Sequence, residues 1–231
     1  KAMDYSEKGI ARRIRRHIGA GTHSFFAVTL PGFESTSVSE LEEIGIECPR
    51  PEPPGGITFE GTINDCFRVN LLSGTITRIL MRVGVFKALH FDVLRKKAGA
   101  LPWELYLGNS APLAFSVACR RSRLRHTERI ADELFEAIRS RMGMYGRQSL
   151  RAEGRESMPP AQRIYARFTD DVCTISIDTS GEPLYRRGYK EYVSDAPLRE
   201  TIASLILRES DARSFRTIID PMSGSGTFSI E

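Results

Sequence analysis

The residues best suited to chemistry lie near the end of the sequence, where a carboxylate precedes a glycine turn. An apolar, strand-like run at 217–219 leads into Asp220, and Gly224 and Gly226 follow before the first residues of a predicted helix. Strand, carboxylate, glycine turn and helix N-terminus, in this order, form the first half of a nucleotide-type cofactor site. The residue types then decide which cofactor fits.

Three kinds of ligand use such a turn. A phosphate-binding P-loop needs a lysine directly after its last glycine, and no lysine follows Gly226. A dinucleotide-binding turn needs a third glycine where this chain has Ser229. S-adenosylmethionine is a sulfonium without phosphate, so it suits a carboxylate at a strand end and glycines that let the backbone approach closely. The spacing alone leaves S-adenosylmethionine and a generic strand–loop–helix turn as equal alternatives.

Charge and hydropathy limit the class of protein. The 231 residues include 33 Lys and Arg against 29 Asp and Glu, a net charge of +4, which is compatible with a polyanionic partner but does not demonstrate one. No apolar run approaches the roughly 18 residues that a transmembrane helix needs, and no signal-peptide pattern is present. We expect a cytoplasmic protein with no membrane partner and room for two small domains.

The four cysteines predict no metal site. They are Cys48, Cys66, Cys119 and Cys173, widely scattered and without a C-x-x-C pair. This spacing indicates neither a zinc site nor a disulfide framework. We interpret the cysteines as buried free thiols.

A basic extension opens the sequence. It contains Arg12, Arg13, Arg15 and Arg16, clustered before Gly19. These arginines fit either an arm that contacts phosphates or the solvated surface of an extension or helix. A charge run alone favours the solvated surface.

The first folded unit has the element order of an α+β sandwich. Strand, helix, strand, helix and strand in succession are typical of a ferredoxin-like fold. In the first helix, Val38, Leu41 and Ile44 repeat at helical spacing and are expected to face the core. The expected strands are 25–30, 57–61 and 78–88, and the expected helices are 35–44 and a segment around 66–71.

A second unit carries the best nucleic-acid signal that composition offers. A helical stretch at 91–107, with Trp103 as a packing residue, leads to a strand at 114–119 and then to an arginine-rich loop. Thr127 is expected to cap the following helix. A basic loop that enters a helix N-terminus is a good anion site, because side chains and free amides point the same way. The arginines are Arg120, Arg121, Arg123 and Arg125, and strands at 163–168 and 172–178 are expected to form a hairpin.

Three sequence blocks in fixed order indicate a family. They are Ile177-Asp-Thr-Ser-Gly-Glu-Pro-Leu-Tyr-Arg-Arg-Gly-Tyr189, Ala196-Pro-Leu-Arg-Glu-Thr-Ile-Ala203 and Asp220-Pro-Met-Ser-Gly-Ser-Gly-Thr-Phe228. Together with Gly55-Gly-Ile-Thr-Phe-Glu-Gly61 and Leu101-Pro-Trp-Glu104, the series resembles the THUMP-domain RNA methyltransferases. These are class I S-adenosylmethionine enzymes that methylate the N2 amine of guanine in rRNA or tRNA. The resemblance spans nearly all of 25–231 and looks closest to the bacterial large-subunit rRNA enzymes.

The resemblance implies a domain layout and a cofactor. The fold would combine α+β ferredoxin-like and THUMP modules with the start of an α/β Rossmann-like methyltransferase domain. The divisions would be a basic extension at 1–23, a ferredoxin-like domain at 24–90, a THUMP RNA-binding domain at 91–187 and a truncated methyltransferase domain at 188–231. S-adenosylmethionine would be bound by Asp220, Pro221, Gly224, Gly226, Leu198, Arg199 and Glu200. Ser223 stands where relatives usually carry cysteine, a change from one small residue to another.

The implied RNA contacts come from two groups of basic residues. The four arginines of the loop at 120–125 form the first group, and Arg186, Arg187 and Lys190 form the second. For the second group an alternative stays open, in which Arg186 and Arg187 brace a domain junction by pairing with Asp178 or Glu182. The resemblance favours rRNA over tRNA as the partner and implies no metal.

Parts of the family's catalytic site are missing from these 231 residues. The Asn/Asp-Pro-Pro-aromatic motif that holds the target amine is absent, and so is the acidic residue after the second catalytic strand. We therefore expect a fragment with an incomplete cofactor site, no catalytic residue and no activity alone. Two alternatives remain: a stand-alone RNA-binding or adaptor module, and a DNA amino-methyltransferase that shares the missing tetrapeptide.

Overall fold

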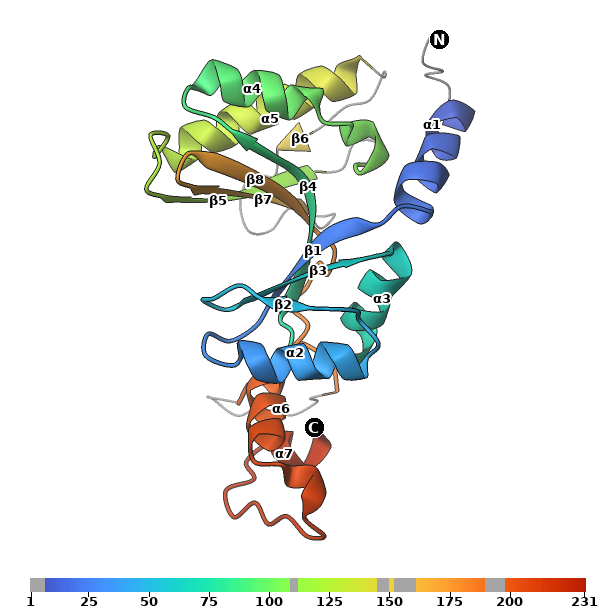
Figure 1. Cartoon of the computed structure of the whole chain (residues 1–231), viewed down its shortest axis with the longest axis vertical. Helices are drawn as coiled ribbons and strands as arrows, with labels where there is room; N and C mark the ends of the chain where they lie inside the picture. Colours follow the sequence, from blue (N-terminus) through green and yellow to red (C-terminus); the bar gives the residue numbers. More distant parts are fainter. Residues whose placement is uncertain (1–6, 109–111, 145–149, 152–160, 190–197) are drawn as a thin grey trace. The chain divides into compact units, whose positions relative to one another are not determined.

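The chain folds into two compact units (Figure 1). The first unit comprises 1–23 and 81–181, and the second comprises 24–80 and 182–231. The structure, a computed structural model, describes residues 7–108, 112–144, 150–151, 161–189 and 198–231. Three residues named above, Lys190, Ala196 and Pro197, lie outside this described part.

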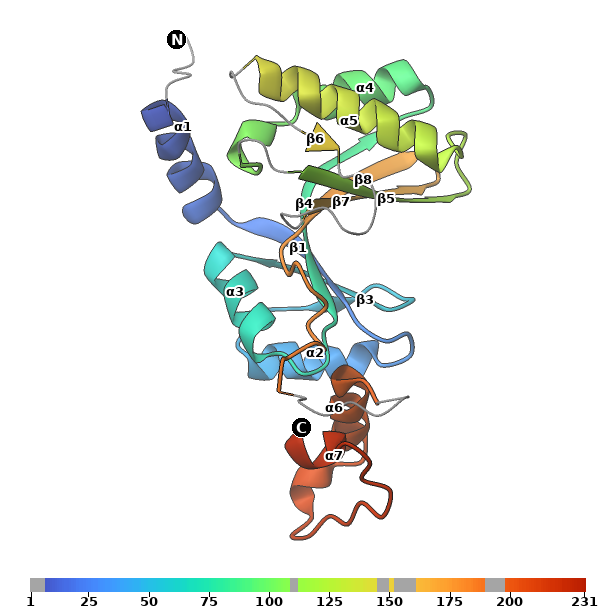
Figure 2. The same cartoon turned by 180° about the vertical axis from the view of Figure 1, so that it is seen from behind.

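The second unit contains the ferredoxin-like arrangement that the sequence predicts (Figure 2). Its elements are β1 (His23–Val28), α2 (Glu34–Glu43), β2 (Arg50–Pro51), β3 (Gly56–Gly61), α3 (Ile63–Leu72) and the beginning of β4 (Arg78–Lys87). The strands lie in the order β2-β3-β1-β4, and β2 is an unpredicted short strand antiparallel to β3. Phe25 and Phe59 stack with their ring centroids 5.1 Å apart, so aromatic side chains from β1 and β3 build the core.

Helix α2 buries a more polar face than its spacing predicts. Leu41 is buried as expected, but Val38 and Ile44 are only half buried. Two glutamates, Glu34 and Glu40, are buried instead. Glu34 accepts hydrogen bonds from two glycine amides, at 2.9 and 2.6 Å. Burial of carboxylates is tolerated where donors satisfy them, so the face that Val38, Leu41 and Ile44 share is only partly buried.

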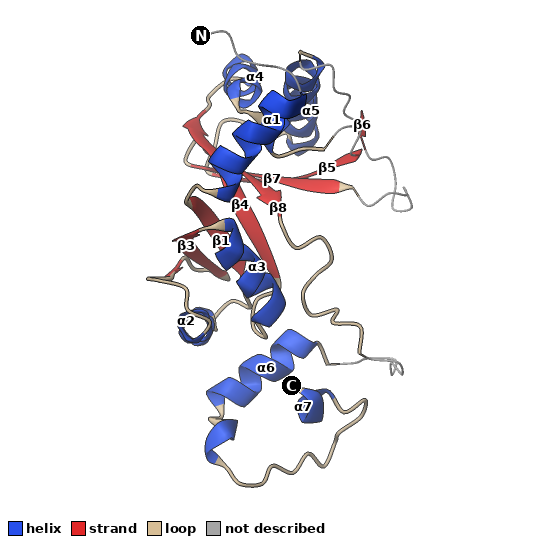
Figure 3. Cartoon of the chain, turned by 90° about the vertical axis from the view of Figure 1, so that its right-hand side faces the viewer, coloured by secondary structure: helices blue, strands red, loops and turns tan. Residues whose placement is uncertain are grey.

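The first unit has two helices, α4 and α5, packed on a mixed sheet (Figure 3). Its elements include α4 (Phe91–Ala100), β5 (Pro112–Arg120), α5 (Thr127–Gly143), β6 (Leu150–Arg151), β7 (Gln162–Thr169) and β8 (Val172–Asp178). The strand order is β4-β8-β7-β5-β6. The expected β7–β8 hairpin is confirmed as antiparallel, whereas β5 and β7 run parallel. Parallel neighbours need a crossover connection, and α5 lies in it.

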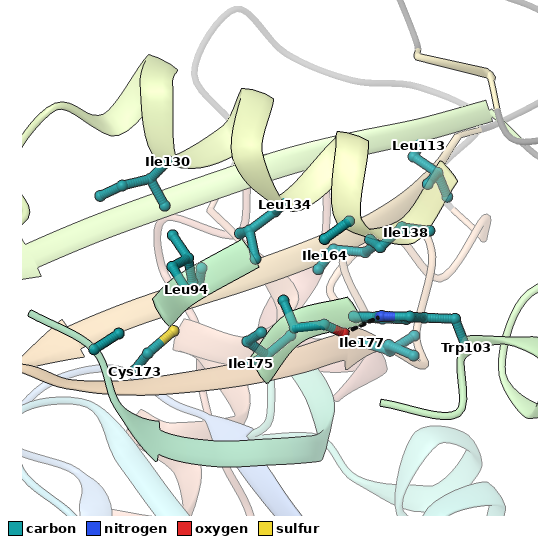
Figure 4. Close-up of a cluster of buried hydrophobic side chains, with 14 of the residues drawn as sticks. Leu94, Trp103, Leu113, Ile130, Leu134, Ile138, Ile164, Cys173, Ile175 and Ile177 are labelled. Atoms are coloured by element: carbon teal, nitrogen blue, oxygen red, sulfur yellow. Dashed lines mark hydrogen bonds between the residues drawn. The ribbon is translucent and has the colours of Figure 1, made fainter. Parts of the chain in front are cut away.

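The predicted helix at 91–107 is shorter than expected. It ends at Ala100, and a single 3₁₀ turn, Trp103–Leu105, follows Pro102, because proline disfavours helical backbone at the residue before it. The Trp103 side chain is fully buried and donates from Nε1 to the Ala98 carbonyl at 2.7 Å (Figure 4). Its expected packing role is confirmed.

Helix α5 begins at Thr127, the residue that the sequence predicts as its N-cap. Thr127 is its first helical residue, and His126 occupies the cap position without a side-chain hydrogen bond. The prediction of Thr127 as the cap was therefore wrong. The helix still starts there because its inward face, with Ile130, Leu134 and Ile138, is fully buried and packing supplies most helical stability.

The four cysteines are free thiols in different surroundings. Cys66 and Cys173 are buried as expected, and Cys173 belongs to the core cluster of the first unit (Figure 4). Cys119 is half buried and Cys48 is exposed. The expectation of burial was thus wrong for Cys48, which lies in a loop with a left-handed backbone at φ +48°.

The last described segment contains three short helical elements. They are α6 (Glu200–Glu209), a 3₁₀ turn at Ala212–Ser214 and α7 (Thr227–Ile230). The strand expected at 217–219 does not form, and Ile218 and Ile219 are 57% and 82% exposed. A strand needs a hydrogen-bonded neighbour, and none of the described strands pairs with this run.

A helical extension precedes β1 in the first unit. Helix α1 (Glu7–Ile14) continues directly into a π-helix, Arg15–Gly19. Gly9 and Ile10 are buried, and Arg13 forms an ion pair with Glu104 at 3.0 Å. The extension is therefore packed onto this unit along one face.

Candidate functional site

The carboxylate of Asp220 leads directly into the glycine turn. Its Oδ1 atom accepts a hydrogen bond from the Met222 amide at 3.0 Å. Its Oδ2 atom is buried and has no hydrogen-bond partner among the described residues. An unsatisfied buried carboxylate oxygen is costly, so this atom is suited to a ligand that donates a hydrogen bond.

Both glycines of the turn adopt backbone angles that other residues rarely reach. Gly224 has φ +51° and Gly226 has φ +72°. A Cβ atom at Gly226 would meet no heavy atom within 4 Å, and one at Gly224 would meet only the Met222 carbonyl, at 3.9 Å. Glycine is therefore required here by backbone angle rather than by crowding, and the space over the turn is open.

A buried carboxylate, Glu231, lies beside this turn. Its side chain is 3% exposed and pairs with Arg187 at 2.8 Å, and it accepts a hydrogen bond from the Tyr189 hydroxyl at 2.6 Å. Burial raises the pKa of Tyr189, and the Glu231 hydrogen bond and the nearby charges of Glu231 and Glu200 raise it further. The tyrosine therefore stays a neutral donor to Glu231.

The three residues expected at the methionine end of the cofactor lie at the start of α6. Arg199 is the cap residue, and its guanidinium lies over the Tyr185 ring at 5.2 Å from the centroid. Glu200 is the first helical residue and is buried, whereas Leu198 is half buried. Helices α6 and α7 contact each other, so this segment and the glycine turn belong to the same cluster of elements.

The basic loop after β5 is organised by an acidic turn. Asp170 and Asp171 form the β7–β8 turn in left-handed conformations, with φ +50° and +63°. Asp170 accepts two hydrogen bonds from the Arg121 guanidinium, both at 2.8 Å, and Asp171 accepts one from the Arg123 amide at 2.7 Å. The loop is therefore held in one conformation before any ligand binds.

The arginines of this loop differ in availability. All four are exposed, but Arg121 is engaged by Asp170, and this hydrogen bond raises the pKa of Arg121. Arg125 donates from Nε to the Ser122 carbonyl at 3.2 Å. Within the described residues the guanidinium groups of Arg120 and Arg123 have no partner, so these two are the most available to an anion.

Two of the three residues in the second group of predicted RNA-binding residues, Arg186 and Arg187, form ion pairs within the protein. Arg186 pairs with Glu182 at 3.0 Å, one of the two partners that the bracing alternative names, but the pair is exposed and lies within one unit. Arg187 pairs with Glu231 at 2.8 Å, not with the expected Asp178 or Glu182, and donates to the Gly74 carbonyl at 2.9 Å. Lys190 lies outside the described residues.

A buried glutamate that the sequence did not reveal ties α2 to α6. Glu40 accepts hydrogen bonds from the amides of Gly74 and Thr75, at 2.8 and 3.0 Å, and pairs with Arg208 of α6 at 3.3 Å. A cavity of about 770 Å³ lies beside this pair, and the glycine turn does not line it. In the sequence nothing distinguishes Glu40 from an ordinary surface glutamate, because its partners lie far along the chain and no periodicity marks them.

Two further features are absent from the described residues. No helix there is both long and apolar enough to cross a membrane. No group of three His, Cys, Asp or Glu side chains is arranged there to hold a metal ion.

Three family descriptions match successive parts of the sequence. Residues 24–80 match the RlmL ferredoxin-like domain, 88–178 match the THUMP domain, and 187–231 match the RMKL-like methyltransferase domain. The first two matches fall on the strands and helices described above.

Similar curated proteins carry methyltransferase names. The chain is 32% identical to a ribosomal RNA large subunit methyltransferase K/L of Psychromonas ingrahamii, over 90% of this chain and 27% of that protein. It is 31% identical to a putative RNA methyltransferase of Synechocystis sp., over 92% of this chain and 54% of that protein. The chain thus spans about half or less of these relatives.

Solved structures with the same fold carry similar names. One is a predicted N6-adenine-specific DNA methylase from Listeria monocytogenes, with a TM-score of 0.75 and 30% identity, covering 94% of this chain and 56% of that one. Another is a putative methyltransferase complexed with SAH, with a TM-score of 0.74 and 27% identity, covering 90% of this chain and 54% of that one.

Proposed function

Because the chain belongs to the THUMP-domain methyltransferases related to the large-subunit rRNA methyltransferases K/L, we propose that it supplies RNA binding and the first cofactor motif of an RNA methyltransferase. The methyl group would pass from S-adenosylmethionine to a guanine N2 of RNA, with rRNA favoured over tRNA. The proposal includes the domain divisions at 23, 90 and 187 and a cytoplasmic location.

The turn at 220–226 is the observation that carries the proposal. The buried Oδ2 of Asp220 lacks a partner among the described residues, and the two glycines open the space above the turn. S-adenosylmethionine would supply an activated methyl group on a sulfonium and an amino group that can donate to this carboxylate. Pro221 and the segment Leu198–Arg199–Glu200 would complete this part of the site.

The residues of the chain would act by binding and orientation. Methyl transfer by direct displacement depends on alignment more than on acid–base groups, and a paired guanine must be exposed before its amine can react. Arg120, Arg123 and Arg125 would bind phosphates, while Arg121 would support the loop through Asp170. We assign Arg186 and Arg187 a bracing role on the basis of their ion pairs.

Methyl transfer tests the proposal directly. Protein from the complete reading frame is incubated with labelled S-adenosylmethionine and unmodified total RNA, and the RNA is resolved by size and digested to nucleosides. We expect label in large-subunit rRNA as N2-methylguanosine. Label in tRNA would change the substrate but keep the chemistry.

An Asp220→Asn variant tests whether cofactor binding depends on the glycine turn at 220–226. Loss of one hydrogen bond to a charged group should lower cofactor affinity about tenfold or more. Asp211→Asn is the matched control, because Asp211 is exposed and asparagine tolerates its left-handed backbone. Equal cofactor affinity in both variants would remove Asp220 from the site.

Two other functions are outcomes of this assay when a parallel reaction contains duplex DNA in place of RNA. Label in duplex DNA but not in RNA would identify a DNA amino-methyltransferase, the activity in the name of the Listeria protein. No label in any nucleic acid, with cofactor binding intact, would leave an RNA-binding or adaptor module.

A further inference from the structure

The helical extension at 7–19 presents a row of positive charges. Lys8, Arg12 and Arg16 follow one another at intervals of four residues, and Arg15 lies beside them; all four are exposed. Residues four apart lie one above the other on a helix, so these side chains share one face. In the described part of the chain none of the four pairs with a carboxylate. Like charges at this spacing destabilise a helix unless an anion binds them.

The opposite face of the extension is fixed to the first unit. Gly9 and Ile10 are buried, and Nη2 of Arg13 donates to Oε1 of Glu104 at 3.0 Å. The Glu104 side chain is 0% exposed and also accepts from Nε and Nη2 of Arg141, at 3.1 and 3.0 Å. Because a buried carboxylate holds the helix, the extension is not a free tail, and Lys8, Arg12, Arg15 and Arg16 stay exposed on the face that is not docked.

We propose that Lys8, Arg12, Arg15 and Arg16 form a second contact surface for the phosphate backbone of RNA. This proposal rests on the proposed RNA-binding function and adds a surface that lies before residue 24, where the first matched domain begins. The charges complement phosphate. Because the helix is already docked, binding costs little additional ordering of the backbone.

RNA fits this surface better than a lipid membrane does. A helix that lies in a membrane interface needs an apolar face to insert between lipids. In this extension Gly9 and Ile10 are already used for docking, Ile18 is half buried, and Ile14, at 36%, is its one exposed large apolar side chain. The exposed face is therefore polar and cationic.

The test measures binding of a fluorescein-labelled RNA stem–loop to the full chain over a range of salt concentrations. In the variant K8Q/R12Q/R16Q the affinity should fall at least about tenfold near 0.1 M salt, and the slope of log K against log [salt] should decrease by about 2 to 3. The three substitutions are on an exposed helix face, and circular dichroism checks that the fold is kept.

A charge-matched variant is the control. R50Q/K96Q/R139Q removes three exposed positive charges elsewhere and should lower the slope far less. A second variant, Arg13→Met, keeps all four charges but removes the tie to Glu104, and it should weaken binding less than the triple variant does. If the two triple variants behave alike, only net charge matters and the proposed surface is wrong.

The two proposals fail in different ways. If the wild-type chain does not bind RNA, the proposed function fails. If it binds and R120Q/R123Q weakens it while K8Q/R12Q/R16Q has no effect, only the second surface is overturned. Binding of the wild type to phosphatidylserine vesicles, lost in K8Q/R12Q/R16Q without a change in RNA affinity, would overturn it in favour of a membrane contact.

Discussion

Buried carboxylates are the residues on which the local structure of both units depends. Each is held by donors from a distant part of the chain, which satisfies the charge inside the protein. They are Glu34, Glu40, Glu104 and Glu231. In each case removal of the carboxylate would leave its donors without this acceptor.

Glu34 should make the second unit sensitive to acid. Hydrogen bonds from the Gly55 amide, its own amide and the Gly32 amide lower the pKa of Glu34 below 4.5. A lowered folded-state pKa adds stability above the unfolded-state pKa, and this stability is lost as the pH falls through the folded value. In Glu34→Gln we therefore expect lower stability than wild type at pH 7 and a gap that closes as the pH falls below 4.5.

Urea unfolding followed by circular dichroism at a series of pH values measures this gap. Glu47→Gln is the control, because Glu47 is exposed and its replacement should leave the difference from wild type constant with pH. A gap for Glu34→Gln that stays constant through the acid range would contradict the assignment.

The thiols should react in the order of their exposure. Burial, with a smaller contribution from Cys119, raises the pKa of Cys173 to about 12, and thiolates are the reactive form. At pH 8 Ellman's reagent should therefore label Cys48 rapidly in the native chain and Cys173 only after unfolding. Rapid labelling that persists in Cys48→Ser would contradict this order.

At the scale of elements, ion pairs attach α6 to the ferredoxin-like arrangement. Arg208 reaches both Glu40 and Glu43 of α2, at 3.3 and 3.0 Å. Arg213 reaches Glu43 at 3.5 Å, and Thr36 donates to Glu209. Since Arg208 is 18% exposed and Glu40 is 3% exposed, the Arg208–Glu40 pair is shielded more than the other contacts.

Loss of this tie should destabilise the second unit alone. Arg208→Met should cost about 2 kcal/mol, because Glu40 keeps its hydrogen bonds from the turn at 73–75. Glu40→Ala should cost about 3 to 5 kcal/mol, because those donors then lose their acceptor. Circular dichroism at 222 nm records both units, whereas fluorescence of Trp103 records the first.

We expect both variants to move the dichroism transition to lower urea and to leave the tryptophan transition in place. Glu42→Ala is the control, since Glu42 is exposed on the same helix. A parallel shift of the Trp103 transition would show that the two units unfold together, and the local interpretation would then be wrong.

At the scale of the whole molecule, the two proposed RNA surfaces lie at opposite ends of α5. The basic loop precedes Thr127, whereas Arg141, which shares Glu104 with Arg13, lies in the last turn. Fourteen residues of helix separate these ends by about 20 Å. An RNA must therefore exceed this length to contact both.

This separation predicts how affinity depends on RNA length. For an RNA longer than about 20 Å, losses from R120Q/R123Q and K8Q/R12Q/R16Q should add in free energy, as they do for independent contacts of one ligand. For a shorter RNA, which contacts only one surface at a time, each variant alone should lose little affinity because the other surface still binds, and the combined variant should lose more than the sum of the two losses. Fluorescence anisotropy with a series of stem lengths measures this, and additivity at every length would contradict the two-ended arrangement.

Local sequence patterns predicted most helices and strands, but they could not predict polar contacts between residues far apart in the sequence. The alternating strands 163–168 and 172–178 became the hairpin, because their side-chain period is a property of neighbouring residues. The apolar run at 217–219 did not become a strand, since a strand also needs a partner. Glu40 and Arg208 are 168 positions apart in the sequence, and nothing local marks them as a pair.

In the candidate functional site, too, local features could be predicted from the sequence and long-range contacts could not. The glycine turn could be predicted because Gly224 and Gly226 are required by their backbone angles. Whether each arginine side chain is free or engaged could not be predicted, because Arg121 and Arg123 are the same residue type. The Arg121 side chain binds Asp170, whereas Arg123 donates only its backbone amide, to Asp171.

The position of Glu40 has a consequence for modularity. One side chain completes the turn at 73–75 within the ferredoxin-like arrangement and also receives Arg208 from the helix that follows residue 198. A chimaera that joins this ferredoxin-like arrangement to a methyltransferase domain without a matching arginine would bury the carboxylate with one donor fewer. Grafts between relatives should therefore exchange the glutamate and the arginine together.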